Sequence, residues 1–496
     1  MNPAVAIGTT PSPSLEARGA RTARLGAWVV LGGFSIVVLA CLLFGRAGML
    51  RLGYPLAAVI VGALLFRIAP ALYLGFTWWL WFLTPFVRRL VDYRIGWEPT
   101  SPVLLAPLLV TGLCGLSLLR HLPKLQRRSL QPFGLVLVAI LGAFPLGVMH
   151  AGLPAATYGL LQWMAPIWFG FHLAVHWDRY PAYRRITQQA FAVGVLVIGL
   201  YGIWQYLSPR PWDTYWMISS QMTSIGQPQP RLIRVFSTMN SPPPFALTLL
   251  AGLILLLSTR AVVQWLAGVP GYTALLLSLV RTAWLGWFVG LVTYAMYLSH
   301  RARFRILAVA GVLALIMVPL LGREQFQEVI PARFASLKTP SQDLSYQARL
   351  AFYAGSIAEI VDHPMGLGLG TTGAATLLEE GGDQGTSQRT FDSGVLDVFR
   401  TLGWAGGAEL FFGGTLLMLA GFARRSRALN DHFADAARAI AIAFAVSMLS
   451  FNSMVAGVGA VFWGFAGLLL AARRYADAPG HGPSHGRAAQ RRMQVA

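Results

Sequence analysis

The stretch SYQARLAFYAGSIAEIVDHP, residues 345–364, lies at the centre of the longest polar segment of the chain, residues 322–392. Apolar runs dominate the sequence on either side, and the whole chain is 55% hydrophobic but only 12% charged. This composition is typical of proteins whose helices cross a lipid bilayer. The sequence therefore predicts an all-α polytopic membrane protein with a long loop outside the membrane.

The apolar runs predict about fourteen transmembrane helices, with about twelve as the lower bound, because about 20 apolar residues cross a bilayer. The predicted spans are 26–44, 53–66, 68–86, 101–119, 133–149, 152–176, 187–207, 242–257, 262–279, 282–299, 304–321, 405–422, 433–452 and 454–472. An even number of spans places both termini on the same side of the membrane.

Arginine and lysine indicate which side is the cytoplasm, because short cytoplasmic loops are rich in these residues. The net charge is +20, and most basic clusters flank apolar spans on the side of the termini, so the charge predicts membrane topology and no nucleic-acid partner. The predicted organisation is a cytoplasmic tail (1–25), a transmembrane region (26–321) with an external loop (208–241), a long external loop (322–392), C-terminal transmembrane helices (393–472) and a disordered cytoplasmic tail (473–496).

Three arginines violate this topology. Arg88, Arg89 and Arg94 fall on the external side, beside the membrane, where they are expected to need an anion.

The long loop is predicted to contain an amphipathic helix over 343–361. Its apolar face would comprise Tyr346, Leu350, Tyr353, Ile357 and Ile360. Arg349 lies beside that face, where it could hold a lipid head group at the membrane surface, and an ordinary surface helix is the alternative. The helix ends at Pro364, and Gly366, Gly368 and Gly370 then predict a flexible turn, since no strand or P-loop lysine accompanies them.

Two further arginines are predicted on the external side. Arg234 precedes a helix start with Asn240 and Ser241 as capping residues and prolines in the first turn, which is a setting that favours phosphate binding. Arg281 lies between two short apolar runs, so it either binds an anion or extends its side chain to the external surface. In the external loop 208–241, which also contains Arg234, Trp212 and Trp216 are either interfacial aromatic residues or platforms for sugar rings.

Acidic residues follow where the chain returns to the membrane. Asp392 could act as a general base with a raised pKa or could cap a helix, and the sequence supports both interpretations equally. Asp397, Arg400 and Glu409 come next and are expected to pair with one another. The cysteines and histidines show no metal-binding pattern, so no metal site and no cofactor are predicted.

Taken together, these motifs resemble the O-antigen ligase and Wzy-type polysaccharide polymerase superfamily over about residues 187–470. The resemblance rests on RVFSTMNSPPPF (234–245), SLVRTAWL (278–285), Arg349 followed by HPMGLG (363–368), and the return to the membrane from Asp392 to Gly406. It implies a GT-C-like, metal-independent glycosyltransferase of the bacterial inner membrane, with its active site facing the periplasm. The implied substrates are a polyprenyl-diphosphate-linked glycan donor and a glycan acceptor in a lipid membrane, and chain-length regulators or export proteins are further candidate partners.

The resemblance also implies roles for individual residues. Arg234, Arg281 and Arg349 match positions where the family places arginines that hold the donor diphosphate, and Asp392 would activate the attacking hydroxyl. Candidate accessory residues are Arg88, Arg89, Arg94, Tyr346, Tyr353 and His363.

One departure from the family decides between its two activities. Ligases carry a histidine, usually in a His-Asn pair, where this chain has Asp392-Ser393, and this difference favours a polymerase of O-antigen or exopolysaccharide repeat units. The alternatives are a ligase that transfers glycan to lipid A core or to protein, and a non-enzymatic transporter or flippase. A transporter is expected to show inverted repeats and matching broken helices, which this sequence lacks.

Overall fold

The computed structural model describes residues 13–301, 303–304, 311, 353, 355–378, 393–423 and 431–479. Within these ranges the chain is built from α-helices and 3-10 helices, with one isolated β-bridge between Gly226 and Ile233. The α-helices of the first half are α1 (Pro13–Leu43), α2 (Leu50–Ile68), α3 (Pro70–Ile95), α4 (Leu105–Gly112), α5 (Gly115–His121), α6 (Gln131–Val175), α7 (Tyr180–Leu207) and α8 (Pro211–Ser219). Those of the second half are α9 (Pro242–Leu256), α10 (Ala261–Leu277), α11 (Arg281–Ala295), α16 (Gly394–Leu402), α17 (Gly407–Ala423), α18 (His432–Ser447) and α19 (Ala456–Asp477). The 3-10 helices are η1 (Ala47–Met49), η2 (Pro102–Leu104), η3 (Leu122–Gln126), η4 (Trp177–Arg179), η5 (Thr223–Ile225) and η7 (Gly373–Leu378).

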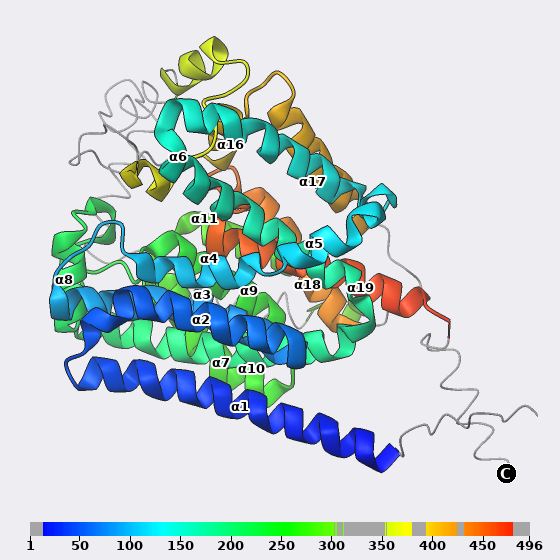
Figure 1. Ribbon diagram of the computed structural model, residues 1–496, viewed down its shortest axis with the longest axis horizontal. Coiled ribbons are helices and arrows are strands. Elements are labelled where there is room, and N and C mark those ends of the chain that lie inside the picture. The colour runs from blue at the N-terminus through cyan, green and yellow to red at the C-terminus, as the bar shows by residue number, and fades with distance from the viewer. Residues whose placement is uncertain are drawn as a thin grey trace, which may run out of the picture.

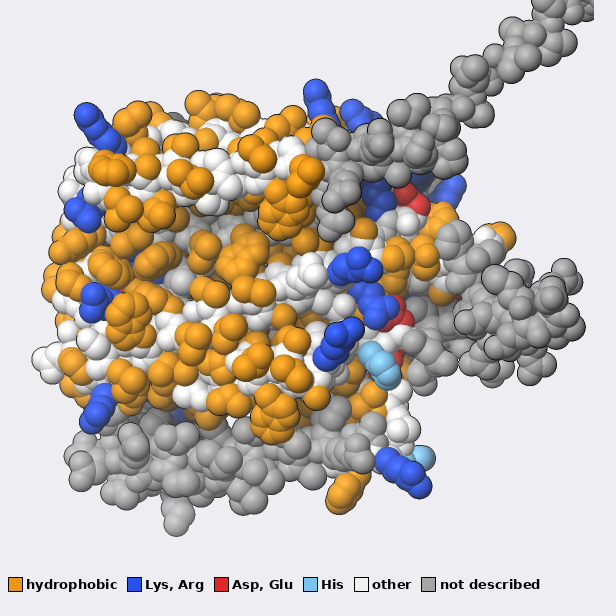
Figure 2. All heavy atoms as spheres, turned by 90° about the horizontal axis from the view of Figure 1, so that it is seen from below, with side chains coloured by type: hydrophobic (Ala, Val, Ile, Leu, Met, Phe, Trp, Pro, Cys, Tyr) orange, Lys and Arg blue, Asp and Glu red, His pale blue; other side chains and the backbone are white. Residues whose placement is uncertain are grey.

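The helices pack side by side in one bundle, with α1 along an edge (Figure 1). α19 is the most enclosed of the long helices, and it packs against α6, α18 and α9 around buried Trp463 and Phe465. The surface of the bundle is largely apolar on the face seen in Figure 2, where Lys and Arg side chains gather mainly toward the two ends. This distribution is the one expected for a protein surrounded by lipid.

Six helical segments of the described chain are long and apolar enough to cross a membrane: Leu25–Leu43, Ala47–Ile68, Pro102–Gln126, Gln131–Val175, Trp177–Leu207 and Ala456–Asp477. The chain is thus an all-helical, multi-pass membrane protein. The predicted number of about fourteen spans is not confirmed, since several helices, such as α9 and α10, are shorter than a full span. The predicted span 304–321 and most of the long loop lie outside the described residues.

Local sequence explains where helices begin and break. Pro242 occupies the first turn of α9, as predicted, and Ser241 is the residue before it, although its side chain makes no capping hydrogen bond. Gly152 has φ 81° and interrupts α6 between the two spans predicted there. The break between α10 and α11 falls directly before Arg281.

The glycine-rich segment 366–370 is not the flexible turn that the sequence predicted. All three glycines are buried and have positive φ, and their backbones touch other backbones. A Cβ added to Gly368 would lie 2.0 Å from the nitrogen of Gly147 in α6, and one added to Gly366 would lie 2.5 Å from the nitrogen of Gly403. Leu367 and Gly368 donate backbone hydrogen bonds to the end of α16. Only residues without side chains allow this close approach, so the segment fixes the end of the long loop against α6 and α16.

We expect Gly368→Ala to destabilise the protein far more than Gly373→Ala. Both glycines have positive φ, which alone penalises alanine by about 1–2 kcal/mol, but a Cβ on Gly373 would meet no atom within 4 Å. The clash at Gly368 should add about 1–3 kcal/mol. Thermal unfolding of the two purified variants measures the difference, and equal stabilities would show that the segment is loosely packed.

Candidate functional site

Arg281 is the first residue of α11 and is exposed at the break between α10 and α11. The preceding residue, Val280, is extended and provides no side-chain cap for the helix. Leu279 before it has φ 55°, a conformation that β-carbon-bearing residues adopt only under constraint. Arg281 therefore combines its own charge with the positive end of the α11 dipole.

Arg234 is bound to the same break from a different part of the chain. Its guanidinium donates to the backbone carbonyls of Ser224 (2.9 Å), Ser278 (3.4 Å) and Leu279 (3.4 Å). The next residue, Val235, donates its backbone N–H to the Leu277 carbonyl at 3.1 Å. The loop before α9 is thereby attached to the turn that carries Arg281.

The two arginines reinforce each other's positive field. Burial, and next the nearby charge of Arg281, lower the pKa of Arg234. Neither arginine forms an ion pair with any residue that the structure describes. Two like charges at a helix start, with no carboxylate among the described residues to neutralise them, create a positive field that favours polyanions.

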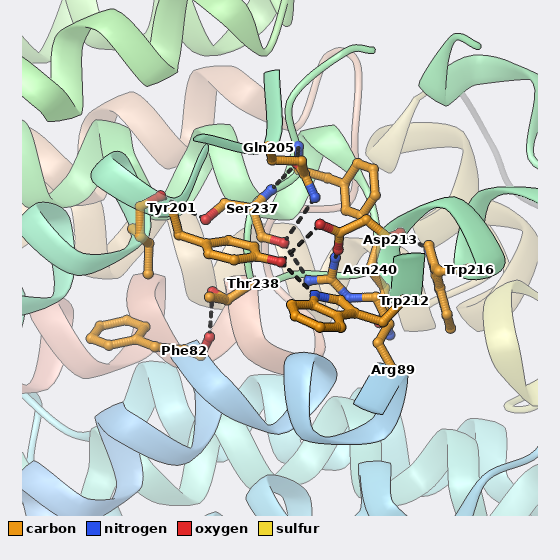
Figure 3. A network of polar contacts seen from close by, with 12 residues as sticks. Phe82, Arg89, Tyr201, Gln205, Trp212, Asp213, Trp216, Ser237, Thr238 and Asn240 are labelled. Atoms are coloured by element: carbon orange, nitrogen blue, oxygen red, sulfur yellow. Dashed lines mark hydrogen bonds and ion pairs between the residues drawn. The ribbon is translucent and has the colours of Figure 1, made fainter. Parts of the chain in front are cut away.

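A buried polar network holds the loop 208–241 in place (Figure 3). At its centre, Arg89 of α3 is fully buried and forms an ion pair with buried Asp213 of α8, and it also donates to the Ser237 carbonyl. Asp213 accepts a second hydrogen bond from the Tyr201 hydroxyl at 2.7 Å, and Tyr201 accepts from the Trp212 indole at 2.8 Å. The network thus ties α3, α7 and α8 to the segment that follows Arg234.

Two side chains complete the attachment of that segment. The Gln205 side-chain oxygen accepts from the backbone N–H groups of Phe236 (3.2 Å) and Ser237 (2.9 Å). The Thr238 hydroxyl donates to the Phe82 carbonyl at 2.7 Å. Because these bonds lie two to four residues after Arg234, they fix the backbone from which that arginine extends.

The structure gives the three arginines at the end of α3 unequal surroundings. Arg88 is 4% exposed, pairs with Asp92 at 3.2 Å and donates to the Glu98 and Pro99 carbonyls. Arg89 is fully buried and bonds to Asp213 and to the Ser237 carbonyl, whereas Arg94 is exposed. Arg88 and Arg89 therefore contribute to the fold through these buried contacts, and their accessory role at the site stays a prediction.

Trp216 is neither an interfacial residue nor a free sugar platform. It is 3% exposed and belongs to a small core with Met217, Ile225, Ile233 and Phe236 inside the loop. Arg88 lies over its ring at 4.8 Å.

The return of the long loop contains a second polar cluster, in which the predicted pairing of Asp397, Arg400 and Glu409 is wrong. Arg400 forms a two-pronged ion pair with Glu359, with both contacts at 2.9 Å. Asp397 accepts from the Asn452 amide at 2.5 Å, and Glu409 accepts from the backbone of Gly406. Their closeness in sequence suggested pairs within this trio, but the partners of Arg400 and Asp397 come from segments distant in sequence.

This cluster lies at the same end of the bundle as Arg281. A Cβ on Gly286 would lie 3.0 Å from the Ser447 hydroxyl, and one on Gly290 would lie 3.3 Å from the Cβ of Ala443. Later residues of α11 thus meet earlier residues of α18, so the two helices run antiparallel and the start of α11, with Arg281, lies near the end of α18. The end of α18 accepts a hydrogen bond from the backbone of Gly394, at the start of α16. The residue before this start, Ser393, directly follows Asp392 in the chain.

The remaining predicted residues fall into two groups. Arg349, Tyr346 and Asp392 lie outside the described residues. Tyr353 is half-buried and His363 is exposed, with its ring 6.4 Å from that of His150 of α6. Of the predicted amphipathic helix 343–361, residues 353 and 355–361 are described and are helical, with Ile360 buried and Ile357 exposed.

We expect stability to fall as pH rises through the pKa of Asp397. Burial raises the pKa of this carboxyl, which lies in a short helix outside the candidate spans. The folded state therefore binds the proton more tightly than the unfolded state, and stability is greatest below the ordinary pKa of aspartate, about 3.9, and declines above it. Thermal unfolding measured at increasing pH from below this value should show falling stability in the wild type and a flatter pH profile in Asp397→Asn. Identical pH profiles in the two proteins would refute the prediction.

Within the described part of the chain, no group of three or more His, Cys, Asp or Glu side chains is arranged to hold a metal ion.

A comparison with protein families covers part of this region. Residues 265–412 match the family model described as O-antigen ligase, a region that includes Arg281, His363 and the Asp397 cluster but not Arg234. No curated protein matches the chain. The family match confirms, over residues 265–412, the resemblance to the O-antigen ligase and Wzy-type superfamily that the motifs predicted.

Proposed function

We propose that the protein is a glycosyltransferase that polymerises polyprenyl-diphosphate-linked oligosaccharide repeat units into O-antigen or exopolysaccharide. The observation that carries this proposal is the pairing of Arg234 and Arg281 at the start of α11, without a carboxylate partner among the described residues. A diphosphate bears the charge and the oxygen acceptors that this pair would satisfy.

In the proposed reaction, an acceptor hydroxyl attacks the anomeric carbon of the donor sugar. The bond between that carbon and the diphosphate oxygen breaks, and the polyprenyl diphosphate leaves with the bonding electrons. Arg234 and Arg281, with Arg349 as a third donor, would stabilise the negative charge that develops on the leaving group. Asp392 would accept the proton of the attacking hydroxyl.

The proposed location is the bacterial inner membrane, with both termini in the cytoplasm and the site facing the periplasm. The clusters of arginine beside the spans support this orientation. The donor and acceptor glycans would then meet where the carrier lipid is exposed to the periplasm.

A ligase that transfers glycan to lipid A core or protein is the second candidate, because the matching family model is described as O-antigen ligase. Asp392-Ser393, in the place where ligases carry histidine, favours the polymerase.

One reconstitution separates these activities. Purified protein in lipid vesicles is incubated with a lipid-linked repeat unit, first alone and then with a lipid A core acceptor. Longer chains from the donor alone support the polymerase, whereas product that requires the second acceptor supports the ligase. Absence of product in both reactions, from protein with an intact unfolding transition, would contradict both and favour a transporter.

A further inference from the structure

Arg210 precedes α8, and its guanidinium has no polar partner among the described residues. Its central carbon lies 4.8 Å from the ring centre of Trp204 and 5.5 Å from that of Trp212. Its Nε is buried and has no hydrogen-bond acceptor, and its guanidinium forms no ion pair or hydrogen bond with the part of the chain that the structure describes. The rings thus hold a charged donor group whose hydrogen-bonding capacity is unused.

Arg88 provides an internal comparison, because it too lies over two indoles. Its guanidinium is 5.0 Å from the Trp97 ring and 4.8 Å from the Trp216 ring. Arg88, however, is 4% exposed and bonds to Asp92 and to two backbone carbonyls. The same stacking therefore occurs once, at Arg88, with hydrogen-bond acceptors supplied by the protein and once, at half-exposed Arg210, with none among the described residues.

The position of Trp204 places Arg210 at the surface of the bilayer. α7 belongs to a candidate span that ends at Leu207, and it presents an exposed stripe with helical spacing. The stripe consists of Val193, Val197, Leu200, Trp204 and Leu207, each between 39% and 53% exposed. An apolar stripe on a membrane helix faces lipid, and a tryptophan in its last turn lies at the level of the lipid head groups.

The second ring is rigidly held. The Trp212 indole donates to Tyr201, which donates to Asp213, the partner of buried Arg89 (Figure 3). Trp212 also packs edge-on against Phe86. The guanidinium of Arg210 is thus oriented before any ligand arrives, which reduces the entropy lost on binding.

We propose that Arg210, held between Trp204 and Trp212, binds the phosphate group of a membrane lipid at the bilayer surface. A planar guanidinium matches two phosphate oxygens, and the exposed face of α7 below it accommodates the lipid chains. A water-borne sugar is disfavoured, because Trp204 lies in the lipid-facing stripe and Arg210 already covers its ring. The proposal invokes neither Arg234 nor Arg281, so it does not depend on the proposed glycosyl transfer.

Binding of defined lipids to the purified full-length protein tests this site. Native mass spectrometry would compare phosphatidylglycerol with diacylglycerol of the same chains, which lacks the phosphate. We expect Arg210→Gln to weaken binding of phosphatidylglycerol about tenfold, as loss of a charge-assisted contact predicts, and to leave diacylglycerol binding unchanged. The affinity of Arg210→Lys for phosphatidylglycerol should be intermediate between those of the wild type and Arg210→Gln, because lysine keeps the charge but lacks the planar guanidinium. If Arg210→Gln fails to fold, the lysine variant takes its place in the comparison.

Arg231→Gln is the matched control, because Arg231 is an exposed arginine of the same loop that stacks on no ring in the described structure. Equal binding by wild type and Arg210→Gln, or an equal loss in Arg231→Gln, would overturn the proposal. Displacement of the lipid by inorganic phosphate at the lipid's own concentration would also overturn it, since the site would then hold any anion. Polyprenyl phosphate is then added as a competitor of phosphatidylglycerol. Competition in the wild type but not in Arg210→Gln would identify the carrier lipid as the ligand, and lack of competition would identify bulk phospholipid. Both results support a lipid-phosphate site.

Discussion

Arg281→Gln should lower the rate of glycosyl transfer by about 10²–10³, the effect of removing one preorganised donor to a developing negative charge. The side chain is exposed at the first turn of α11 and forms no ion pair in the described structure, so its loss should leave the fold intact. Arg281→Lys should retain part of the activity, because the charge remains while two-pronged binding is lost. The rate is measured as the formation of longer chains from a lipid-linked repeat unit by reconstituted protein.

Arg260→Gln is the control for this experiment. Arg260 is an exposed arginine directly before α10, just as Arg281 begins α11, but it lies at the opposite end of α10 from the break. Its replacement removes the same charge and should leave the rate unchanged. Normal chain length in Arg281→Gln, with the protein present in the membrane, would remove Arg281 from the proposed site.

Asp213→Ala should destabilise the protein by about 3–5 kcal/mol, because it leaves the charge of Arg89 buried without its carboxylate. Both side chains of this pair are fully buried, and Tyr201 and Ser237 bond to the same network. The double variant Arg89→Met, Asp213→Leu should recover much of the loss, since it removes both buried charges together. Thermal unfolding in detergent micelles measures the three stabilities.

Asp178→Ala provides the matched surface change. Asp178 is 63% exposed and lies 3.8 Å from Arg179, and such a pair contributes only about 0–1 kcal/mol. A loss in Asp213→Ala no greater than that in Asp178→Ala would show that the buried pair is unimportant for folding. Loss of the network should also reduce glycosyl transfer, because the network holds the loop that carries Arg234. The rate of chain elongation by the same variants measures this effect.

Much of the helical framework could be predicted from the sequence, because apolar length and helix-breaking residues are local properties. The run that became α9 begins at Pro242, α6 is interrupted at Gly152, and α11 begins at Arg281, close to the boundaries expected from composition alone. The number of membrane crossings was harder to predict, because an apolar run that packs inside the bundle has the same composition as one that faces lipid.

The partners of buried polar groups depended on tertiary structure. Arg89 forms its ion pair with Asp213, and Arg400 forms one with Glu359, because such pairs depend on which segments pack together and not only on spacing along the chain. The close packing of the glycines at 366–370 likewise could not be predicted from the sequence, since glycine occurs both in flexible turns and where two backbones touch. The sequence by itself determined that this is a helical membrane protein with arginines at the ends of its helices. Tertiary structure decided which of those arginines are neutralised inside the protein and which, such as Arg281 and Arg210, remain available to an anion, because a charge is neutralised only by the groups that folding brings within reach of it.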